Sequence, residues 1–239
     1  MDNWLGMYED PYAVRRLSKA ASISQTKPGM KVIEFGSYHE ALLPWLPDPV
    51  HYFPVDYEQF TTRTTVIDLN SLKPDILAYC PKASCDRLFA LEVLEHLIRP
   101  ELALTFMLRF LSKDGLAIIS LPNEATLFHR LRALLGTVDA ECFGECGKHL
   151  HLPSLSQTRL FLSKFGQILD WQPYINSSAK GSRQEWVGHL MRLLPDWLWL
   201  KLAHWLPSLF ARGWIFLLKP YLPSNHPKNG GASDSDSAA

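Results

Sequence analysis

The sequence predicts an α/β fold with a mainly parallel β-sheet. Between residues 30 and 175, short apolar runs that end in polar or turn residues alternate with stretches of helical periodicity. This alternation is typical of βαβ units. The 239 residues, of which 47% are hydrophobic, suffice for one well-buried domain with an extension or for two small domains.

The expected elements follow one another along the chain. Strands are expected at residues 31–36, 51–56, 64–69, 86–92, 115–123 and 166–175, and helices at residues 11–21, 39–46, 93–97, 101–111 and 154–165. Residues 224–239 are rich in Ser, Asp and Gly and contain no large apolar residue, which predicts a disordered tail. Ligands of parallel sheets bind at the carboxyl ends of the strands. The residues that directly follow each strand are therefore the first candidates for a site.

Composition excludes several classes of protein. The 24 basic and 24 acidic residues balance, which argues against a nucleic-acid binder, since such proteins need an excess of positive charge. Four cysteines are too few for a disulfide scaffold in a chain of this size. The first residues show no basic segment followed by an apolar run, and no stretch of 18 apolar residues exists. We therefore expect a cytoplasmic protein with no secretory signal and no transmembrane helix.

Carboxylates stand at three successive strand ends. Glu34 precedes the turn glycine Gly36, Asp56 ends the second strand, and Asp68 lies at the end of the third. A glycine lets the backbone turn tightly beside a ligand, and an acid about 20 residues later can accept hydrogen bonds from ribose hydroxyls. The spacing predicts a nucleoside pocket, although ordinary loop carboxylates would give the same pattern.

The ordered segments KVIEFG, VDYEQ, VIDLN, DRLFALEVLEHL and LSKDGLAIISLPN resemble the motifs of class I S-adenosylmethionine-dependent methyltransferases. LEVLEHL, LPN and the later HLHLPSLSQTRLFLSKFG resemble the subgroup that includes the ubiquinone- and methionine-biosynthesis methyltransferases. The resemblance covers about residues 28–172. It implies a Rossmann-like seven-stranded sheet with helices on both faces, and S-adenosylmethionine as the cofactor.

The resemblance also implies roles for individual residues. The methionine portion of the cofactor would lie beside the first strand and its loop, the ribose beside the acid of the second strand, the adenine beside the third strand, and the sulfonium above the loop after the fourth. The resemblance assigns the methionine portion to Glu34, Gly36, Ser37 and Tyr38, and the ribose to Asp56. It assigns the adenine to Asp68 and Leu69, and the sulfonium to Glu92. Glu95 and His96 match the family's Glu-His pair.

The glycine loop departs from the family pattern of an acid followed by three alternating glycines. Tyr38 and Glu40 stand where the second and third glycines would be. Tyr38 would fill space near the methionine portion or force a different loop path, and Glu40 at a helix start would repel the methionine carboxylate. We expect weaker cofactor binding, binding through an altered loop, or a fold retained without the chemistry.

Methyl transfer requires alignment of donor and acceptor, and it can require removal of a proton from the acceptor. His149, which matches the family's loop histidine, is the first candidate for the base, followed by His129 and His96. His96 can equally have a packing or capping role, and His129 can equally be a surface residue. His149 and His151 also follow Cys142 and Cys146, a spacing that could bind zinc. We expect no metal here, because the resemblance already explains the histidine.

Tryptophan is concentrated near the C-terminus, where five of the eight lie between Trp186 and Trp214. Lys201, His204, Ser208 and Arg212 fall on one helical stripe among large apolar residues. Such a face predicts contact with a membrane surface through residues 183–222. A helical lid over the acceptor pocket, or an oligomer interface, would have a similar composition.

These observations divide the chain into a methyltransferase-like domain (residues 1–182), an amphipathic helical extension (residues 183–223) and the tail (residues 224–239). The predicted function is methyl transfer from S-adenosylmethionine to a small lipophilic or membrane-linked acceptor, such as a quinone precursor or a lipid-linked glycan. The predicted location is the cytoplasm, peripheral to the inner face of the membrane, and a homo-oligomer is an open possibility. The alternative is a non-catalytic protein of the same fold that acts as an interaction or membrane-associated scaffold.

Overall fold

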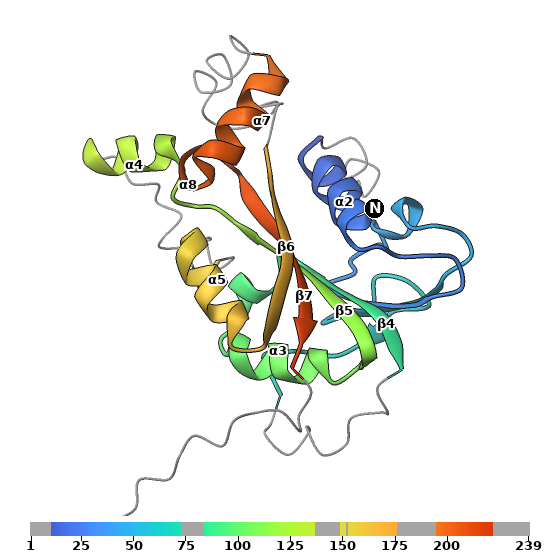
Figure 1. The fold of residues 1–239 in the computed structure, drawn as a ribbon. Helices are drawn as coiled ribbons and strands as arrows, with labels where there is room; N and C mark the ends of the chain where they lie inside the picture. Colours follow the sequence, from blue (N-terminus) through green and yellow to red (C-terminus); the bar gives the residue numbers. More distant parts are fainter. Residues whose placement is uncertain (1–10, 73–83, 137–148, 152, 176–194, 222–239) are drawn as a thin grey trace, which may run out of the picture.

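A computed structural model describes residues 11–72, 84–136, 149–151, 153–175 and 195–221 (Figure 1). Its centre is a seven-stranded sheet with the order β3-β2-β1-β4-β5-β7-β6. The strands are β1 (Lys31–Phe35), β2 (His51–Asp56), β3 (Thr65–Val66), β4 (Cys85–Leu91), β5 (Leu111–Pro122), β6 (Gly166–Tyr174) and β7 (Gly213–Pro220). Strands β1 to β5 pair in parallel, and β7 is antiparallel to β5 and β6. The predicted seven-stranded α/β sheet is therefore confirmed.

Helices cover both faces of the sheet, as predicted (Figure 1). One face packs against α2 (Pro11–Ile23) and the 3₁₀ turn η1 (Leu43–Trp45), and the other against α3 (Pro100–Leu108), α5 (Leu155–Ser163) and α7 (Asp196–Trp205). Shorter helices are η3 (Leu94–His96), α4 (Leu127–Leu134) and α8 (Pro207–Phe210). On β4, Leu88 and Ala90 face one layer while Phe89 and Leu91 face the other. Burial on both faces explains why the central strands are continuous apolar runs.

The helix predicted at residues 39–46 is wrong. The chain forms a turn through Leu42 and then only the 3₁₀ turn η1. Glu40 has a φ of 60°, which lies outside the right-handed helical region. Pro47 follows directly and cannot continue a helix. No α-helix N-terminus therefore follows the Gly36 loop.

The C-terminal segment differs from the prediction of one helical extension. Residues 213–220 form β7, between β5 and β6, so the predicted boundary at residue 183 separates a strand from its own sheet. The side chains of Trp199 and Trp214 are buried, whereas those of Trp197 and Trp205 are exposed. Trp186 lies outside the described residues. Tryptophan therefore serves both the core and the surface.

The polar stripe of the predicted extension does not continue along one helix. The helix α7 ends at Trp205, before Pro207, and α8 ends at Phe210. The break at Pro207 was expected from its missing N–H. Among the residues that the structure describes, no helix has both the length and the apolar character needed to cross a bilayer.

Candidate functional site

The site begins at the loop after β1. The backbone N–H groups of Gly36 and Ser37 donate hydrogen bonds to the carbonyl of Val55, over 2.9 and 3.2 Å. Gly36 has a φ of 74°, and a Cβ at this position would lie 2.5 Å from Cγ2 of Val93. Only glycine fits both the left-handed conformation and this close approach. The loop is thereby held between β2 and the segment after β4.

Tyr38 adopts the conformation for which the family pattern has a glycine. Its φ is 47°, in a region that side chains rarely occupy. The centroid of its ring lies 4.3 Å from that of His39 and 4.8 Å from that of Phe60. Aromatic contacts of this kind stabilise the unusual backbone. The loop thus has glycine-like geometry without the glycine.

Glu40 has the same character. Its φ is also positive, and its buried carboxylate accepts a hydrogen bond from Thr61 Oγ1 over 2.6 Å and forms an ion pair with Arg63. The guanidinium of Arg63 balances the charge that was expected to repel an anionic ligand. Both replaced glycines are therefore tied to the segment that follows β2.

Asp56 lies where the ribose-binding acid was predicted, at the end of β2. Its two carboxylate oxygens accept hydrogen bonds from the backbone N–H groups of Tyr38 and Tyr57, each over 2.8 Å. Burial raises the pKa of Asp56, although both hydrogen bonds act in the opposite direction. Each oxygen of an ionised carboxylate can accept more than one hydrogen bond. A loop amide therefore orients Asp56 and leaves it able to accept from a ribose diol.

Asp68 and Leu69 follow β3. The carboxylate of Asp68 is exposed and, within the described part of the chain, accepts hydrogen bonds from Asn70 and Ser71. The hydroxyl of Ser71 lowers the pKa of Asp68. Leu69 is partly buried against the apolar core on the face of the sheet that α3 covers. Asp68 therefore organises its own turn, and its contact with adenine stays a prediction.

Glu34 is buried beneath the loop and accepts a hydrogen bond from the hydroxyl of Tyr52. Burial raises the pKa of Glu34 to about 8, against the opposing effects of the Tyr52 hydrogen bond and the charge of Arg16. At neutral pH its carboxyl group is therefore mostly protonated. It would hold a proton beneath the loop rather than present a charge to a ligand.

Glu92, after β4, is the point at which three elements meet. Its φ is 57°. Arg16 of α2 forms an ion pair with it, and the hydroxyl of Tyr174 on β6 donates a hydrogen bond to its Oε1 over 2.6 Å. Sequence reasoning found Glu92 but missed Arg16 and Tyr174, because no local spacing links residues so far apart in the chain.

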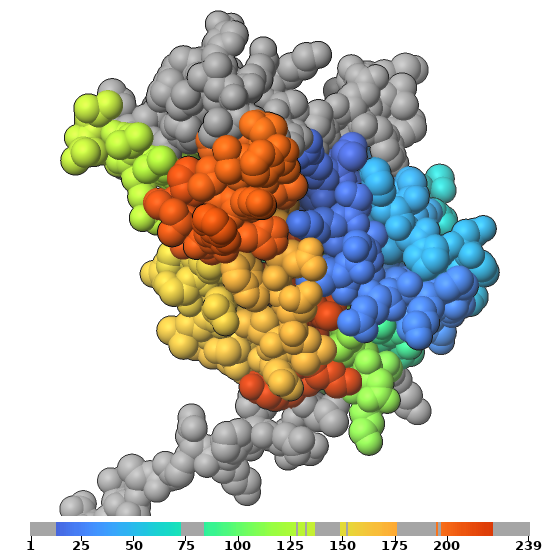
Figure 2. Space-filling model, turned by 45° about the horizontal axis from the view of Figure 1, so that its top comes forward, coloured from blue at the N-terminus to red at the C-terminus, as the bar shows by residue number. Residues whose placement is uncertain are grey.

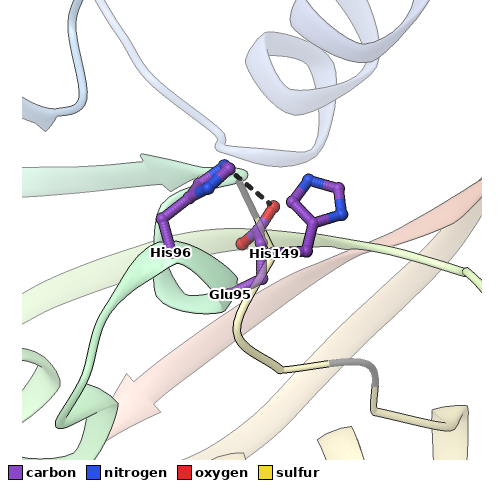
Figure 3. Close-up of side chains that lie close together, drawn as sticks. All are labelled: Glu95, His96 and His149. Carbon is purple, nitrogen blue, oxygen red and sulfur yellow. Dashed lines mark ion pairs between the residues drawn. The ribbon is translucent and has the colours of Figure 1, made fainter. Parts of the chain in front are cut away.

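A second group of side chains lies beside η3 (Figure 3). Glu95 is fully buried, and among the residues that the structure describes neither of its carboxylate oxygens has a hydrogen-bond partner. His96 Nε2 lies 4.0 Å from Glu95 Oε1, and the rings of His96 and His149 are 4.9 Å apart. Burial, followed by the charge of Glu92, raises the pKa of Glu95 to about 8. The N–H groups of Leu150 and His151 donate to the Glu95 carbonyl and fix the segment that carries His149.

One ligand atom from each of Glu95, His96 and His149 lies within 4.8 Å of the others. A carboxylate and two imidazoles form a donor set that divalent ions such as zinc accept. Of the residues in the zinc arrangement weighed from the sequence, His151 bonds to the carbonyl of Leu97 through Nε2. Cys142 and Cys146 lie outside the described residues. The absence of a metal stays a prediction.

Glu124, after β5, connects His149 to the C-terminal segment. Its carboxylate lies 3.3 Å from Nδ1 of His149 and 3.6 Å from Nη1 of Arg212. Burial would raise the pKa of Glu124, but the hydrogen bond of His149 and the charges of Arg212 and His129 lower it to about 2. Glu124 is therefore anionic and can orient the His149 ring.

The structure brings two of the three predicted bases together. The rings of His96 and His149 are in contact. His129, on α4, is near enough to Glu124 for its charge to lower the pKa of that carboxylate, and its Nδ1 bonds to Oγ1 of Thr126 over 3.0 Å. Glu124 was missed by the sequence reasoning. Its position directly after the LPN segment, at a strand end, was the available signal.

The strand order and the antiparallel β7 are those of the class I S-adenosylmethionine-dependent methyltransferase fold. A family model described as a methyltransferase domain matches residues 8–167. The chain belongs to this methyltransferase domain family, and S-adenosylmethionine is the cofactor of the class. The carboxylate of Asp56, which the Tyr38 amide orients and which can accept further hydrogen bonds, has the chemistry that the ribose of that cofactor requires.

Solved structures share the fold at low sequence identity. A methyltransferase from a complex with the Trm112 activator of Haloferax volcanii has a TM-score of 0.56 and 13% identity, covering 91% of this chain and 93% of that chain. A SAM-dependent methyltransferase from Archaeoglobus fulgidus has a TM-score of 0.55 and 13% identity, covering 90% and 99%.

The [4+2]-cyclase SpnF is also similar, with a TM-score of 0.53 and 15% identity, covering 88% of this chain and 83% of that chain. No curated protein matches the sequence significantly. Since one fold hosts different reactions, the activity has to be inferred from the site.

Proposed function

We propose that the protein transfers a methyl group from S-adenosylmethionine to a small lipophilic or membrane-linked acceptor. The observation that carries this proposal is the Gly36 loop, whose Tyr38 amide orients Asp56 at the end of β2. Bound S-adenosylmethionine supplies an electrophilic methyl group on a sulfonium. The side chains of the protein would bind the cofactor, orient it toward the acceptor and remove a proton from the acceptor.

Asp56 would accept hydrogen bonds from both ribose hydroxyls. Arg16 and Glu92 form an ion pair near the end of β4. This pair offers one charge of each sign, which suits the zwitterionic amino-acid end of the cofactor. Tyr174 fixes Glu92 through its hydroxyl. The ordered charges would align the methyl group, which is the main contribution an enzyme makes to such a displacement.

His149 would accept the acceptor's proton. Its Nδ1 lies 3.3 Å from the carboxylate of Glu124, an arrangement that orients the ring. Removal of a general base typically slows a reaction by about 10²–10⁴-fold. His149→Gln should therefore slow methyl transfer while leaving cofactor binding intact.

The lipophilic nature of the acceptor is proposed from the surface of α7. Trp205 is 78% exposed, and Trp197 is also exposed. The ammonium of Lys201 lies 5.1 Å from the ring centroid of Trp197. Exposed tryptophans beside a cation are typical of helices that lie at a membrane interface. We propose from these side chains that the protein lies at the inner face of the cytoplasmic membrane.

One observation favours the non-catalytic alternative. The Gly36 loop leads into a turn and η1 rather than an α-helix, so the site lacks a helix dipole directed at an anionic ligand. Under this alternative the fold would serve as a scaffold that binds no methyl donor.

Transfer of label from [methyl-³H]S-adenosylmethionine to a lipid extract of the source cells tests the proposal. The full chain should label an organic-soluble product, His149→Gln should label it slowly, and Asp56→Ala should not label it. Label that enters no fraction, lipid or aqueous, at millimolar donor would overturn the enzyme proposal in favour of the scaffold.

A further inference from the structure

A cleft of about 500 Å³ opens between α2, the end of β6 and α7. Figures 1 and 2 show α2 and α7 on either side of the β6 end, with α7 in orange and α2 in blue. Tyr174 lines the cleft and also bonds to Glu92. The cleft therefore adjoins Glu92, one of the two residues proposed to hold the amino-acid end of the cofactor.

One wall of the cleft is polar. It is the face of α2 that carries Arg15, Ser18, Lys19 and Ser22, which recur at the three- and four-residue spacing of one helix face. The opposite face of α2, including Leu17 and Ala20, is buried in the core. None of the residues that line the cleft within the described chain is acidic.

Lys19 is the informative residue of this wall. It is half-buried, and its ammonium donates a hydrogen bond to the carbonyl of Pro173 over 3.0 Å. In the described part of the chain, no carboxylate pairs with it. Burial lowers the pKa of Lys19. A desolvated cation with a neutral partner is stabilised by an anion that enters the cleft.

The other wall is apolar. Ile175 is buried directly after β6, and the half-buried Leu200 projects from α7. A ligand that fills the cleft would contact the cationic side chains of Arg15 and Lys19 and two serine hydroxyls on one side, and aliphatic carbon on the other. This combination suits a molecule with an anionic group and an apolar body.

We propose that the cleft binds the methyl acceptor, and that this acceptor is an amphiphile whose phosphate or carboxylate group pairs with Lys19 while its apolar body lies against Ile175 and Leu200. The proposal rests on the proposed methyltransferase function, because the cleft meets that site at Tyr174.

Calorimetric titration of the full chain with octyl phosphate, below its micelle concentration, tests the proposal. Inorganic phosphate, octanol and octanoate are the matched probes. Octyl phosphate should bind at least about ten-fold more tightly than inorganic phosphate or octanol, because it alone of these three uses both walls. Octanoate that binds as well as octyl phosphate supports a carboxylate as the anionic group. Inorganic phosphate or octanol that binds equally well overturns the proposal.

Lys19→Gln is the informative variant, since its amide can still donate to Pro173 while the charge is lost. It should weaken octyl phosphate binding about ten-fold and leave octanol binding unchanged. Lys164→Gln, which changes an exposed lysine at the end of α5, should change neither. Equal affinities of the two variants for octyl phosphate would contradict the assignment.

Titration of the same proteins with S-adenosylhomocysteine separates this proposal from the proposed function. S-adenosylhomocysteine binding without octyl phosphate binding overturns the cleft proposal and leaves the methyltransferase function standing. Octyl phosphate binding without S-adenosylhomocysteine binding overturns the acceptor role, since no methyl donor would then serve the cleft.

Discussion

Replacement of Gly36 by alanine tests the loop geometry on which the site depends. The new Cβ would lie 2.5 Å from Cγ2 of Val93, and the backbone would keep a φ of 74°. Alanine in the left-handed region costs about 1–2 kcal/mol, and overpacking a buried contact costs about 1–3 kcal/mol. We expect Gly36→Ala to lower the free energy of unfolding by about 2–5 kcal/mol.

Gly29 provides a matched control. Its φ is 83°, but a Cβ there meets nothing within 4 Å, so Gly29→Ala should lose only the backbone contribution of about 1–2 kcal/mol. Urea unfolding of both variants measures the difference. Adding Val93→Ala to Gly36→Ala should recover about 1–3 kcal/mol of coupling energy in a double-mutant cycle.

The same substitution has a functional readout. A shift of the loop at Gly36 displaces the Tyr38 amide that orients Asp56, so S-adenosylhomocysteine should bind Gly36→Ala at least about ten-fold more weakly than Gly29→Ala. If the two variants were equally stable and bound the ligand equally well, the close approach of Gly36 to Val93 would be refuted.

Three further predictions follow from buried or exposed side chains. The pKa of Glu34 is about 8 in the folded chain, against an ordinary value of 4.5. The free energy of unfolding should therefore fall as pH rises from about 4.5 to 8. Urea unfolding of Glu34→Gln should show a flatter pH dependence than that of the wild type, and an unchanged slope would contradict this. No metal is expected at Glu95, His96 and His149, so zinc should leave the melting temperature of the wild type unchanged. A rise that Glu95→Gln abolishes would contradict this and show a metal site at these residues. Trp205→Ser, on α7, should reduce the fraction of protein that floats with anionic liposomes. Leu160→Ser, which changes an exposed apolar residue on α5, should not. Equal flotation of the two variants would contradict a membrane contact through α7.

The sheet was largely predictable from the sequence, because its central strands are buried on both faces. The buried parts of such strands are continuous apolar runs, as in residues 88–91 of β4 and residues 116–119 of β5. The strand β7 was missed because GWIFLLKP lies in a tryptophan-rich region where a short apolar run cannot be distinguished from a buried helix. Its partners β5 and β6 are far away in the sequence, so pairing gave no local signal.

The error at residues 39–46 has a different cause. Apolar spacing favours a helix there, but Glu40 is held at a positive φ by contacts with Thr61 and Arg63. Tertiary contacts therefore override local propensity at this loop. A sequence pattern does not show which tertiary contacts will stabilise an unusual backbone conformation.

The site was predictable where its residues stand at strand ends. Asp56 and Gly36 were identified from this rule and lie at adjacent strand ends in the sheet. Arg16, Tyr174 and Arg212 were not, because each reaches its carboxylate partner from an element far away in the sequence. Long-range ion pairs and hydrogen bonds depend on the packing of α2, β6 and β7, which no local motif encodes.

Calorimetric titration with S-adenosylhomocysteine tests the central claim most directly. The wild type should bind, and Asp56→Ala should bind at least about a hundred-fold more weakly, because each hydrogen bond from a ribose hydroxyl to a carboxylate contributes about 1.5–3 kcal/mol. Asp114→Ala, at an exposed acid on β5, should bind like the wild type. Absence of binding by the wild type at millimolar ligand, or equal binding by Asp56→Ala, would contradict a cofactor site at these strand ends.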